Sequence, residues 1–290
     1  MIRAYFDMEN SDFRLVDPVK PLAAYIGGKR NLAERIAKRI DAVPHDTYAE
    51  PFVGMGGIFL RRSRAPKAEV INDLSGDVIG FFRVLQRHYI AFVDFLRFQI
   101  TSRREFERLV RTDPSTLTDL ERAARFLYLQ RTAFGGKVVG RHFGVQHGRA
   151  ARFDVTALGP LLEAVHERLA GVVIECLPYG DLIHRYDRPA TLFYLDPPYH
   201  GTEEVYGQGA FSQADYGALA EIIAGMDGRV IMSINDTPFI RSCFSRLEIE
   251  EINTSYSLAA KGSMVAKELL ITNFAPEAPY GTLRGLLRAD

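Results

Sequence analysis

One stretch of the chain combines a buried strand with an unusual turn directly after it. The run Thr191–Leu195 is apolar, β-branched or aromatic throughout, which is typical of a strand buried on both faces of a parallel sheet. Four residues follow it at once and are called the DPPY tetrad below: Asp196, Pro197, Pro198 and Tyr199. Because open α/β sheets bind ligands at the carboxyl ends of their strands, we expect the tetrad to lie in a binding site.

Each part of the tetrad suits a reaction on an aromatic amine. An exocyclic amino group shares its lone pair with the ring and is therefore a poor nucleophile. The Asp196 carboxylate and the Pro197 carbonyl could accept its N–H groups and return electron density to the nitrogen, and neither proline has an N–H to donate. Tyr199 offers a ring for stacking, worth ~1–3 kcal/mol per base. The tetrad predicts methylation of an amino group on a planar base; the alternative is an ordinary strand exit with a buried tyrosine.

Composition limits the other possibilities. A chain of 290 residues suggests one large domain or one domain with an insertion, and 36 basic and 36 acidic residues exclude a globally cationic coat protein but allow local basic faces. The two cysteines, Cys176 and Cys243, form no CxxC, and no His cluster has metal-ligand spacing, so we expect neither a metal nor a disulfide framework. Without a signal peptide or a run of eighteen apolar residues, we expect a cytoplasmic protein.

Strand and helix patterns divide the chain into two regions. Buried strands are expected at Tyr48–Glu50, Glu69–Asp73, Val172–Cys176, Thr191–Leu195, Arg229–Ile234 and Glu268–Thr272. A helix is expected over 58–63, and helical periodicity without buried strands runs from about residue 75 to 170. The pattern predicts a cofactor-binding α/β domain made of residues 1–82 and 166–290, interrupted by a mainly helical insertion at 83–165.

A glycine-rich turn and a later carboxylate predict a cofactor site. Gly54 and Gly56 let the backbone approach a ligand, and Asp73 is placed to accept from ribose hydroxyls. The chain has no complete G-x-G-x-x-G and no Lys-Ser/Thr after the glycines, which disfavours a pyrophosphate or P-loop site. An adenosine cofactor without phosphates fits better, and the cationic sulfonium of S-adenosylmethionine suits carboxylates and aromatic faces. Close packing of the glycines and helix capping by Asp73 are the alternatives.

Three other residues are candidates for the same site. Asp181 could accept from the adenine amine of the cofactor while Leu182 packs on its ring, although an Asp in this position is equally typical of a helix N-cap. Lys29, after two glycines, could orient the methionine carboxylate, or simply open a surface helix.

The predicted insertion contains a basic stretch without a single acid. Its cations between residues 122 and 152 are Arg122, Arg125, Arg131, Lys137, Arg141, Arg149 and Arg152. Arginine suits phosphates and guanine edges, so we predict binding to double-stranded DNA; a solvated helix face is the alternative. An amine inside a duplex must swing out of the stack, and we expect the loop Gly201–Gly209 to close over it unless it is a plain surface loop.

In this order the motifs resemble a known family, the Dam-type DNA adenine-N6 methyltransferases. The segments that carry the resemblance are Tyr25–Lys29, Glu50–Gly56, Asn72-Asp73, the DPPY tetrad, Phe211-Ser212, Ser233–Asp236 and Lys267–Ile271, which span almost the whole chain. The resemblance implies a Rossmann-like methyltransferase fold with about seven mostly parallel strands, one of them reversed. It also implies methyl transfer from S-adenosylmethionine to N6 of a flipped-out adenine at a specific DNA site.

The resemblance further implies roles for individual residues. Cofactor contacts are implied for Tyr25, Lys29, Phe52, Gly54, Gly56, Asp73, Asp181, Leu182 and Asp196. Asp196 also binds the target amine, Tyr199 stacks on the base, and the insertion recognises the target. Two segments depart from the family: Phe134–Lys137 lacks the Asn of Phe-Asn-Gly, and His142–Gly148 replaces the Phe-Asn-Val-Pro-x-Gly of GATC methylases. GATC specificity is therefore not implied.

Other functions stay open beside this one. The same enzyme class could act on cytosine N4, RNA or a protein glutamine, and a catalytically silent DNA-binding protein could use the same scaffold; a dehydrogenase is a more distant possibility. Asp rather than Ser or Asn at position 196, together with the basic insertion, favours adenine in DNA. We expect a monomer or weak dimer without metal, associated with the nucleoid through DNA.

Overall fold

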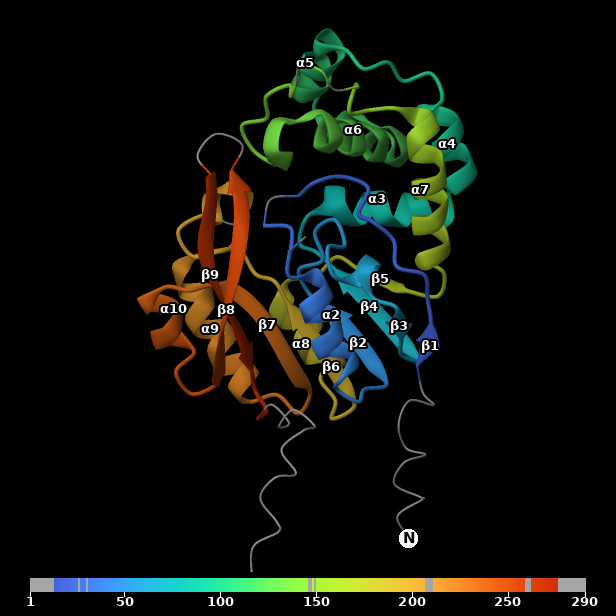
Figure 1. The fold of residues 1–290 in the computed structure, drawn as a ribbon. Helices are drawn as coiled ribbons and strands as arrows, with labels where there is room; N and C mark the ends of the chain where they lie inside the picture. The colour runs from blue at the N-terminus through green and yellow to red at the C-terminus, as the bar shows by residue number, and fades with distance from the viewer. Residues whose placement is uncertain are drawn as a thin grey trace, which may run out of the picture.

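A mixed seven-stranded sheet forms the centre of the protein (Figure 1). The computed structural model describes residues 13–25, 27–29, 31–145, 148, 150–206, 211–258 and 262–275; for residues 204, 206, 253–258 and 262–266 it describes the backbone only. Arg149 and residues 207–209 of the expected closing loop lie outside this part of the chain. The strands of the sheet are β2 (Thr47–Glu50), β4 (Ala68–Asn72), β5 (Val173–Glu175), β6 (Thr191–Leu195), β7 (Arg229–Asn235), β8 (Glu248–Leu258) and β9 (Gly262–Thr272).

The strand order is β5-β4-β2-β6-β7-β9-β8. The first five of these strands pair in parallel, whereas β9 runs antiparallel to both β7 and β8. The expected mostly parallel sheet with one reversed strand is therefore confirmed. A separate two-stranded ribbon pairs β1 (Arg14–Leu15) with β3 (Arg64–Ala65).

Helices cover both faces of this sheet. The α-helices are α2 (Ala33–Asp41), α3 (Gly76–Arg87), α4 (Tyr89–Leu96), α5 (Arg103–Arg111), α6 (Asp119–Thr132), α7 (Val155–Arg168), α8 (Tyr179–Tyr186), α9 (Gln213–Ala224) and α10 (Pro238–Cys243). The 3-10 helices are η1 (Phe59–Arg61), η2 (Pro114–Thr116), η3 (Phe134–Gly136) and η4 (Glu203–Tyr206). One core packs α2, α3 and the helices of the insertion against the sheet, and the other packs α8, α9 and α10 against the opposite face.

Strand β6 shows why this sequence forms a central strand. Alternate side chains of a strand point to opposite faces, and here Leu192 and Tyr194 enter one core while Phe193 and Leu195 enter the other. All five residues of β6 are buried. The prediction of a strand buried on both faces at 191–195 is confirmed, and it places Asp196 at the carboxyl end of the central strand.

The helices α4 to α7 form a layer above the carboxyl edge of the sheet (Figure 1). Helix α3 packs against α6, so it joins this layer to the sheet. The expected domain boundaries at residues 82/83 and 165/166 fall inside α3 and α7. The division into two domains stays a prediction.

Two local expectations differ from the structure. Residues 58–63 form only the short 3-10 helix η1 rather than a longer helix, because the preceding turn is folded tightly around glycines at positive φ. Strand β8 was not expected at all, since its sequence alternates acidic and apolar residues instead of forming an apolar run. The expected capping pair Ser212 and Asp215 is confirmed at the start of α9.

Candidate active site

A cavity of about 990 Å³ lies at the carboxyl ends of β2, β4 and β6. Glu50, Asp73 and Asp196 reach it from the ends of these three strands, and Lys29 and Phe52 also line it. This volume is within the range of pockets that hold small molecules and cofactors. The sheet therefore brings the predicted cofactor turn and the DPPY tetrad into one cavity. Its three carboxylates, Glu50, Asp73 and Asp196, are 23 to 146 positions apart in the sequence.

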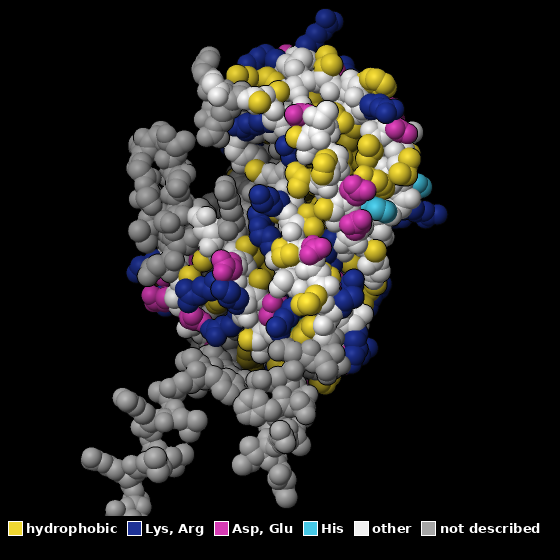
Figure 2. All heavy atoms as spheres, turned by 45° about the vertical axis from the view of Figure 1, so that its right-hand side comes forward, with side chains coloured by type: hydrophobic (Ala, Val, Ile, Leu, Met, Phe, Trp, Pro, Cys, Tyr) yellow, Lys and Arg dark blue, Asp and Glu magenta, His cyan; other side chains and the backbone are white. Residues whose placement is uncertain are grey.

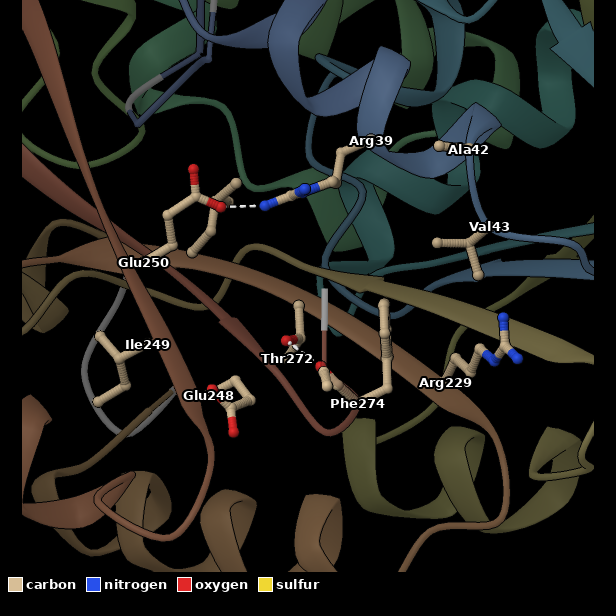
Figure 3. Close-up of a pocket in the computed structure, with 11 residues that line it drawn as sticks. Arg39, Ala42, Val43, Arg229, Glu248, Ile249, Glu250, Thr272 and Phe274 are labelled. Atoms are coloured by element: carbon tan, nitrogen blue, oxygen red, sulfur yellow. Dashed lines mark hydrogen bonds and ion pairs between the residues drawn. The ribbon is translucent and has the colours of Figure 1, made fainter. Parts of the chain in front are cut away.

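A second, much smaller cavity of about 180 Å³ lies between α2 and strands β7, β8 and β9 (Figure 3). Its most prominent polar contact is the ion pair between Arg39 and Glu250. Of the described residues that line it, none belongs to the predicted site. The larger cavity, which the predicted residues line, is therefore the candidate active site.

The Asp196 carboxylate is paired with a buried cation. Lys29 Nζ lies 2.7 Å from Asp196 Oδ1 and 3.6 Å from Glu268 Oε2. The Lys29 side chain is 1 % exposed, whereas that of Asp196 is 21 % exposed. Burial raises the pKa of Asp196 to about 6, because its removal from water outweighs the attraction of Lys29. Asp196 is thus an accessible carboxylate in a largely buried charge cluster.

Side chains from helix α9, strand β7 and the loop before α2 hold the turn of the tetrad. Tyr216 Oη donates to Pro198 O over 3.0 Å. The Asn235 side-chain amide makes two hydrogen bonds to the backbone of His200, the residue after the tetrad. His200 N–H donates to Asn235 Oδ1 over 2.9 Å, and Asn235 Nδ2 donates to His200 O over 3.0 Å. The Tyr199 hydroxyl contacts Lys29 Nζ, which lies 4.0 Å from the centre of the Tyr199 ring. The turn is therefore fixed by side chains that sequence reasoning did not assign to it.

The glycine turn and Asp73 are joined directly. Gly54 N–H and Ser75 N–H each donate to the Asp73 carboxylate over 2.9 Å. Gly54 has φ +50°, and a Cβ there would lie 3.0 Å from Tyr25 Cδ1. Burial raises the pKa of Asp73 despite these two backbone donors. Both proposed roles of Asp73 are thus compatible with the geometry: it caps the chain before α3, and it lines the cavity.

A buried asparagine ties three strand ends together around this turn. Asn72 Nδ2 donates to Pro51 O over 2.9 Å and to Leu177 O over 3.0 Å, and Leu177 N–H donates to Asn72 Oδ1 over 2.8 Å. These bonds link the segments that follow β2, β4 and β5. Asn72 appeared in the sequence only as the neighbour of Asp73, yet it holds Pro51 and Leu177, which line the cavity.

Glu50 is the most deeply buried carboxyl group of the cavity. It is 1 % exposed, and Tyr48 Oη donates to its Oε2 over 2.7 Å. Burial, with a smaller contribution from the nearby Asp196, raises the pKa of Glu50 to about 8. Glu50 is therefore mostly protonated at neutral pH, which composition and motif could not indicate.

Three predicted cofactor residues lie elsewhere. Gly56, Asp181 and Leu182 are absent from the described residues that line the cavity. A Cβ on Gly56 would lie 2.8 Å from Leu60 Cγ, so this glycine permits close packing. Asp181 is exposed in the first turn of α8, and Leu182 is completely buried in the core beneath it.

An aromatic wall replaces them along the cavity. Phe52, Tyr179 and Phe211 all line it, and their ring centroids are 5.5 to 6.0 Å apart. Tyr179 Oη also donates to Asp215 Oδ1 over 3.1 Å. Phe52 was predicted here; the participation of Tyr179 and Phe211 was missed, since only their folding onto Phe52 brings them together.

Most of the predicted DNA-binding arginines donate to backbone carbonyls, nearly all of them within residues 83–165. Arg125 is 8 % exposed, and its Nε donates to Leu109 O over 2.8 Å. The other contacts of this kind join Arg122 to Pro114 O, Arg131 to Arg152 O and Leu22 O, Arg141 to Lys137 O, and Arg152 to Ala133 O. Lys137 is exposed. On the face shown in Figure 2, basic side chains are interspersed with acidic and hydrophobic ones.

The comparison with known families agrees with this geometry. Residues 25–258 match the family model described as D12 class N6 adenine-specific DNA methyltransferase. The chain belongs to this family. The protein is thus a site-specific adenine-N6 DNA methyltransferase of the D12 class, an enzyme that requires a methyl donor.

Curated relatives of this D12 methyltransferase are similar over most of their length. The type II methyltransferase M.CviBI of Paramecium bursaria Chlorella virus NC1A is 23 % identical, covering 88 % of this chain and 98 % of the relative. The type II methyltransferase M1.LlaDCHI of Lactococcus lactis subsp. cremoris is 25 % identical, covering 88 % and 96 %. The DNA adenine methylase of Serratia marcescens is 26 % identical, covering 85 % and 95 %.

The described part of the D12 methyltransferase has neither a metal-binding group nor a membrane-spanning helix. In the part of the chain that the structure describes, no group of three or more His, Cys, Asp or Glu side chains could hold a metal ion. No helix within the same residues combines the length and the apolar character needed to cross a bilayer.

Proposed function

We propose that this methyltransferase uses S-adenosylmethionine, bound along the cavity from Asp73 to Asp196. The carboxylates suit a ligand with ribose hydroxyls and a cationic sulfonium, and the aromatic wall suits its adenine. Gly54 leaves room where a larger side chain would meet Tyr25. Phe52, Tyr25 and Asp73 would hold the adenosine half, and the bound cofactor would supply the methyl group.

The protein prepares the acceptor at the opposite end of the cavity. Asp196 Oδ and the Pro197 carbonyl would accept the two N–H groups of the adenine amine, and Tyr199 would stack on the ring. Lys29 occupies Asp196 Oδ1 in the structure, so the amine would compete with this ammonium for the carboxylate. The observation that carries the proposal is this arrangement: the carboxylate of the tetrad lies in the same cavity as the glycine turn and Asp73.

The target base would be taken from double-stranded DNA and flipped into the cavity. The helices α4 to α7 stand above the carboxyl edge of the sheet (Figure 1), and a duplex would approach the cavity from this side. Exposed Lys137 is the best placed of the predicted cations; Arg122, Arg131, Arg141 and Arg152 already donate to backbone carbonyls, which leaves only their remaining N–H groups for phosphates. With DNA as substrate, we further propose action in the cytoplasm at the nucleoid, as a monomer or weak dimer, and in the context of restriction–modification suggested by the named relatives.

Methylation mapping tests the proposal. The full chain is expressed in cells without their own adenine methylation, and their DNA is sequenced by a long-read method that detects N6-methyladenine. We expect modified adenine in one fixed short context, and none with an Asp196→Ala variant that folds and binds S-adenosylmethionine by calorimetry. Modification on cytosine, modification in RNA alone, or undiminished activity of Asp196→Ala would each overturn the proposal.

A further inference from the structure

The Lys29 ammonium lies between two carboxylates of unequal accessibility. It is 2.7 Å from Asp196 Oδ1, which faces the cavity, and 3.6 Å from Glu268 Oε2, whose side chain is 2 % exposed. Glu268 lies on β9 and pairs in register with Asn235 on β7, whose side chain is hydrogen-bonded to His200 directly after the tetrad. Glu268 also lies beyond residue 258, where the family match ends.

This geometry creates a conflict for the reaction. An ammonium bonded to Asp196 Oδ1 leaves only Oδ2 for the adenine amine, and it draws electron density away from the carboxylate that should activate that amine. A lysine that is 1 % exposed cannot move into water without breaking the packing around it, and an isolated buried ammonium would be strongly unfavourable. The second carboxylate solves this conflict, because a movement of about 1 Å would bring Lys29 Nζ from ion-pair to hydrogen-bond distance of Glu268.

We propose that Glu268 is a positioning residue that receives Lys29 when adenine occupies Asp196. With the base absent, Lys29 holds Asp196 and Tyr199 in place. With the base bound, Lys29 shifts to Glu268 and leaves the Asp196 carboxylate free for the amine. This inference rests on the proposed function for the identity of the incoming amine, but the coupling among the three charged groups is a property of the ligand-free protein.

The groups around Asp196 make the coupling measurable. Lys29 and the Ser233 hydroxyl favour its ionised form, whereas Glu268 disfavours it through like-charge repulsion; Glu50 and Tyr199 are the other titratable neighbours. Replacing Glu268 with glutamine removes the repulsion between the two carboxylates. Of Asp196 and Glu268, only Asp196 is then left as an anionic partner for Lys29. Lys29 should then remain on Asp196, and the pKa of that carboxyl should fall.

The test uses Glu268→Gln, with Glu268→Asp as the rescuing variant and Glu251→Gln as the matched control on β8, where the side chain is 56 % exposed and pairs with Arg241. We expect Glu268→Gln to lower kcat by about 10- to 100-fold, with a smaller change in KM for DNA, because one charge-assisted partner is lost. The acid limb of the kcat profile should move to lower pH. Glu268→Asp should restore part of kcat, and Glu251→Gln should behave as wild type.

Two further measurements show whether Glu268 acts through Lys29. In a Lys29→Met background, Glu268→Gln should cause no additional loss of kcat. Carbon-13 NMR of the ligand-free protein should show a lower titration midpoint for the Asp196 carboxyl in Glu268→Gln than in wild type. Additive losses, or an unchanged midpoint with only a lower melting temperature, would overturn the inference. If wild type methylates no DNA, the proposed function fails, while the NMR titration still tests the coupling of Glu268 to Asp196, and an unchanged midpoint would overturn the inference by itself.

Discussion

Replacing Glu50 with glutamine should stabilise the protein at neutral pH but not in acid. Glu50 is almost completely buried, and its carboxyl accepts a hydrogen bond from Tyr48 Oη. Burial raises its pKa from 4.5 to about 8. Glutamine has nearly the same shape and keeps an acceptor for Tyr48, but it has no charge to remove from water.

The sign of the effect follows from the two protonation states. The folded pKa of Glu50 lies above the unfolded one, so the folded protein binds the proton more tightly. Its contribution to stability is fully present below the unfolded value and is lost as the pH rises from about 4.5 to about 8. Near pH 7 Glu50 is ionised in the unfolded chain and must take up a proton on folding. Because this pH is about 2.5 units above the unfolded pKa, the protonation costs about 3 kcal/mol. Glu50→Gln should recover much of this free energy.

Thermal and urea unfolding at several pH values would measure the effect. For a chain of this size, about 3 kcal/mol corresponds to a rise of about 6 °C in Tm near pH 7, shrinking to nearly zero near pH 4. The exposed Glu163→Gln on α7 is the matched control and should show no pH-dependent difference. A gain of the same size at every pH, or a loss at pH 7, would refute the reasoning, because either result means that Glu50 is not protonated by burial.

Three other substitutions have defined outcomes. Tyr199→Ala should lower kcat/KM for DNA by about 10- to 100-fold through lost base stacking, measured by transfer of labelled methyl groups. Gly54→Ala should cost about 1–2 kcal/mol in urea unfolding and weaken cofactor binding in calorimetry, since its φ of +50° and the contact with Tyr25 are both unfavourable for a side chain. Glu69→Gln should cost about 3–5 kcal/mol, because it leaves the buried Arg62 and Arg168 without their anionic partner.

Each of these three substitutions has an outcome that would contradict the expected effect, and the first two have a control variant. Tyr199→Phe keeps the ring and should retain most activity; an equal loss in Tyr199→Phe and Tyr199→Ala would rule out stacking. Gly80→Ala, on α3 with open space around its Cα, should not destabilise the protein, and a neutral Gly54→Ala would contradict the strain argument. A Glu69→Gln variant as stable as wild type would mean that the two arginines are satisfied without the carboxylate.

The parallel half of the sheet could be predicted from the sequence because its strands are buried on both faces. Thr191–Leu195 is apolar at every position, and the structure places the strand at these same residues. Strand β8 lies at the sheet edge and begins Glu248-Ile249-Glu250, with polar residues on one side, so it gives no apolar run. The expectation of one reversed strand followed from the family resemblance alone, which did not say which strand it is; the structure shows that it is β9.

The chemical types in the site could be predicted, but their partners could not. Lys29 was expected near the cofactor carboxylate, yet its nearest anion is Asp196, 167 positions away in the sequence. Arg125 counts as a surface cation in any charge tally, although its guanidinium is buried against the Leu109 carbonyl. Charge patterning shows where cations occur along a chain; only packing decides whether a cation faces solvent or satisfies a backbone oxygen.

The insertion and the cofactor cavity share one rigid element. Glu69 on β4 accepts from Arg168, the last residue of α7, over 2.7 Å, and from Arg62 over 2.9 Å, all three being buried. Asp73, directly beyond the same strand, holds the glycine turn. Breaking this buried network would cost several kcal/mol, so hinge motion of α7 relative to β4 is disfavoured. We therefore infer that the adenine moves toward the cavity, while the helical layer and the sheet keep their relative position.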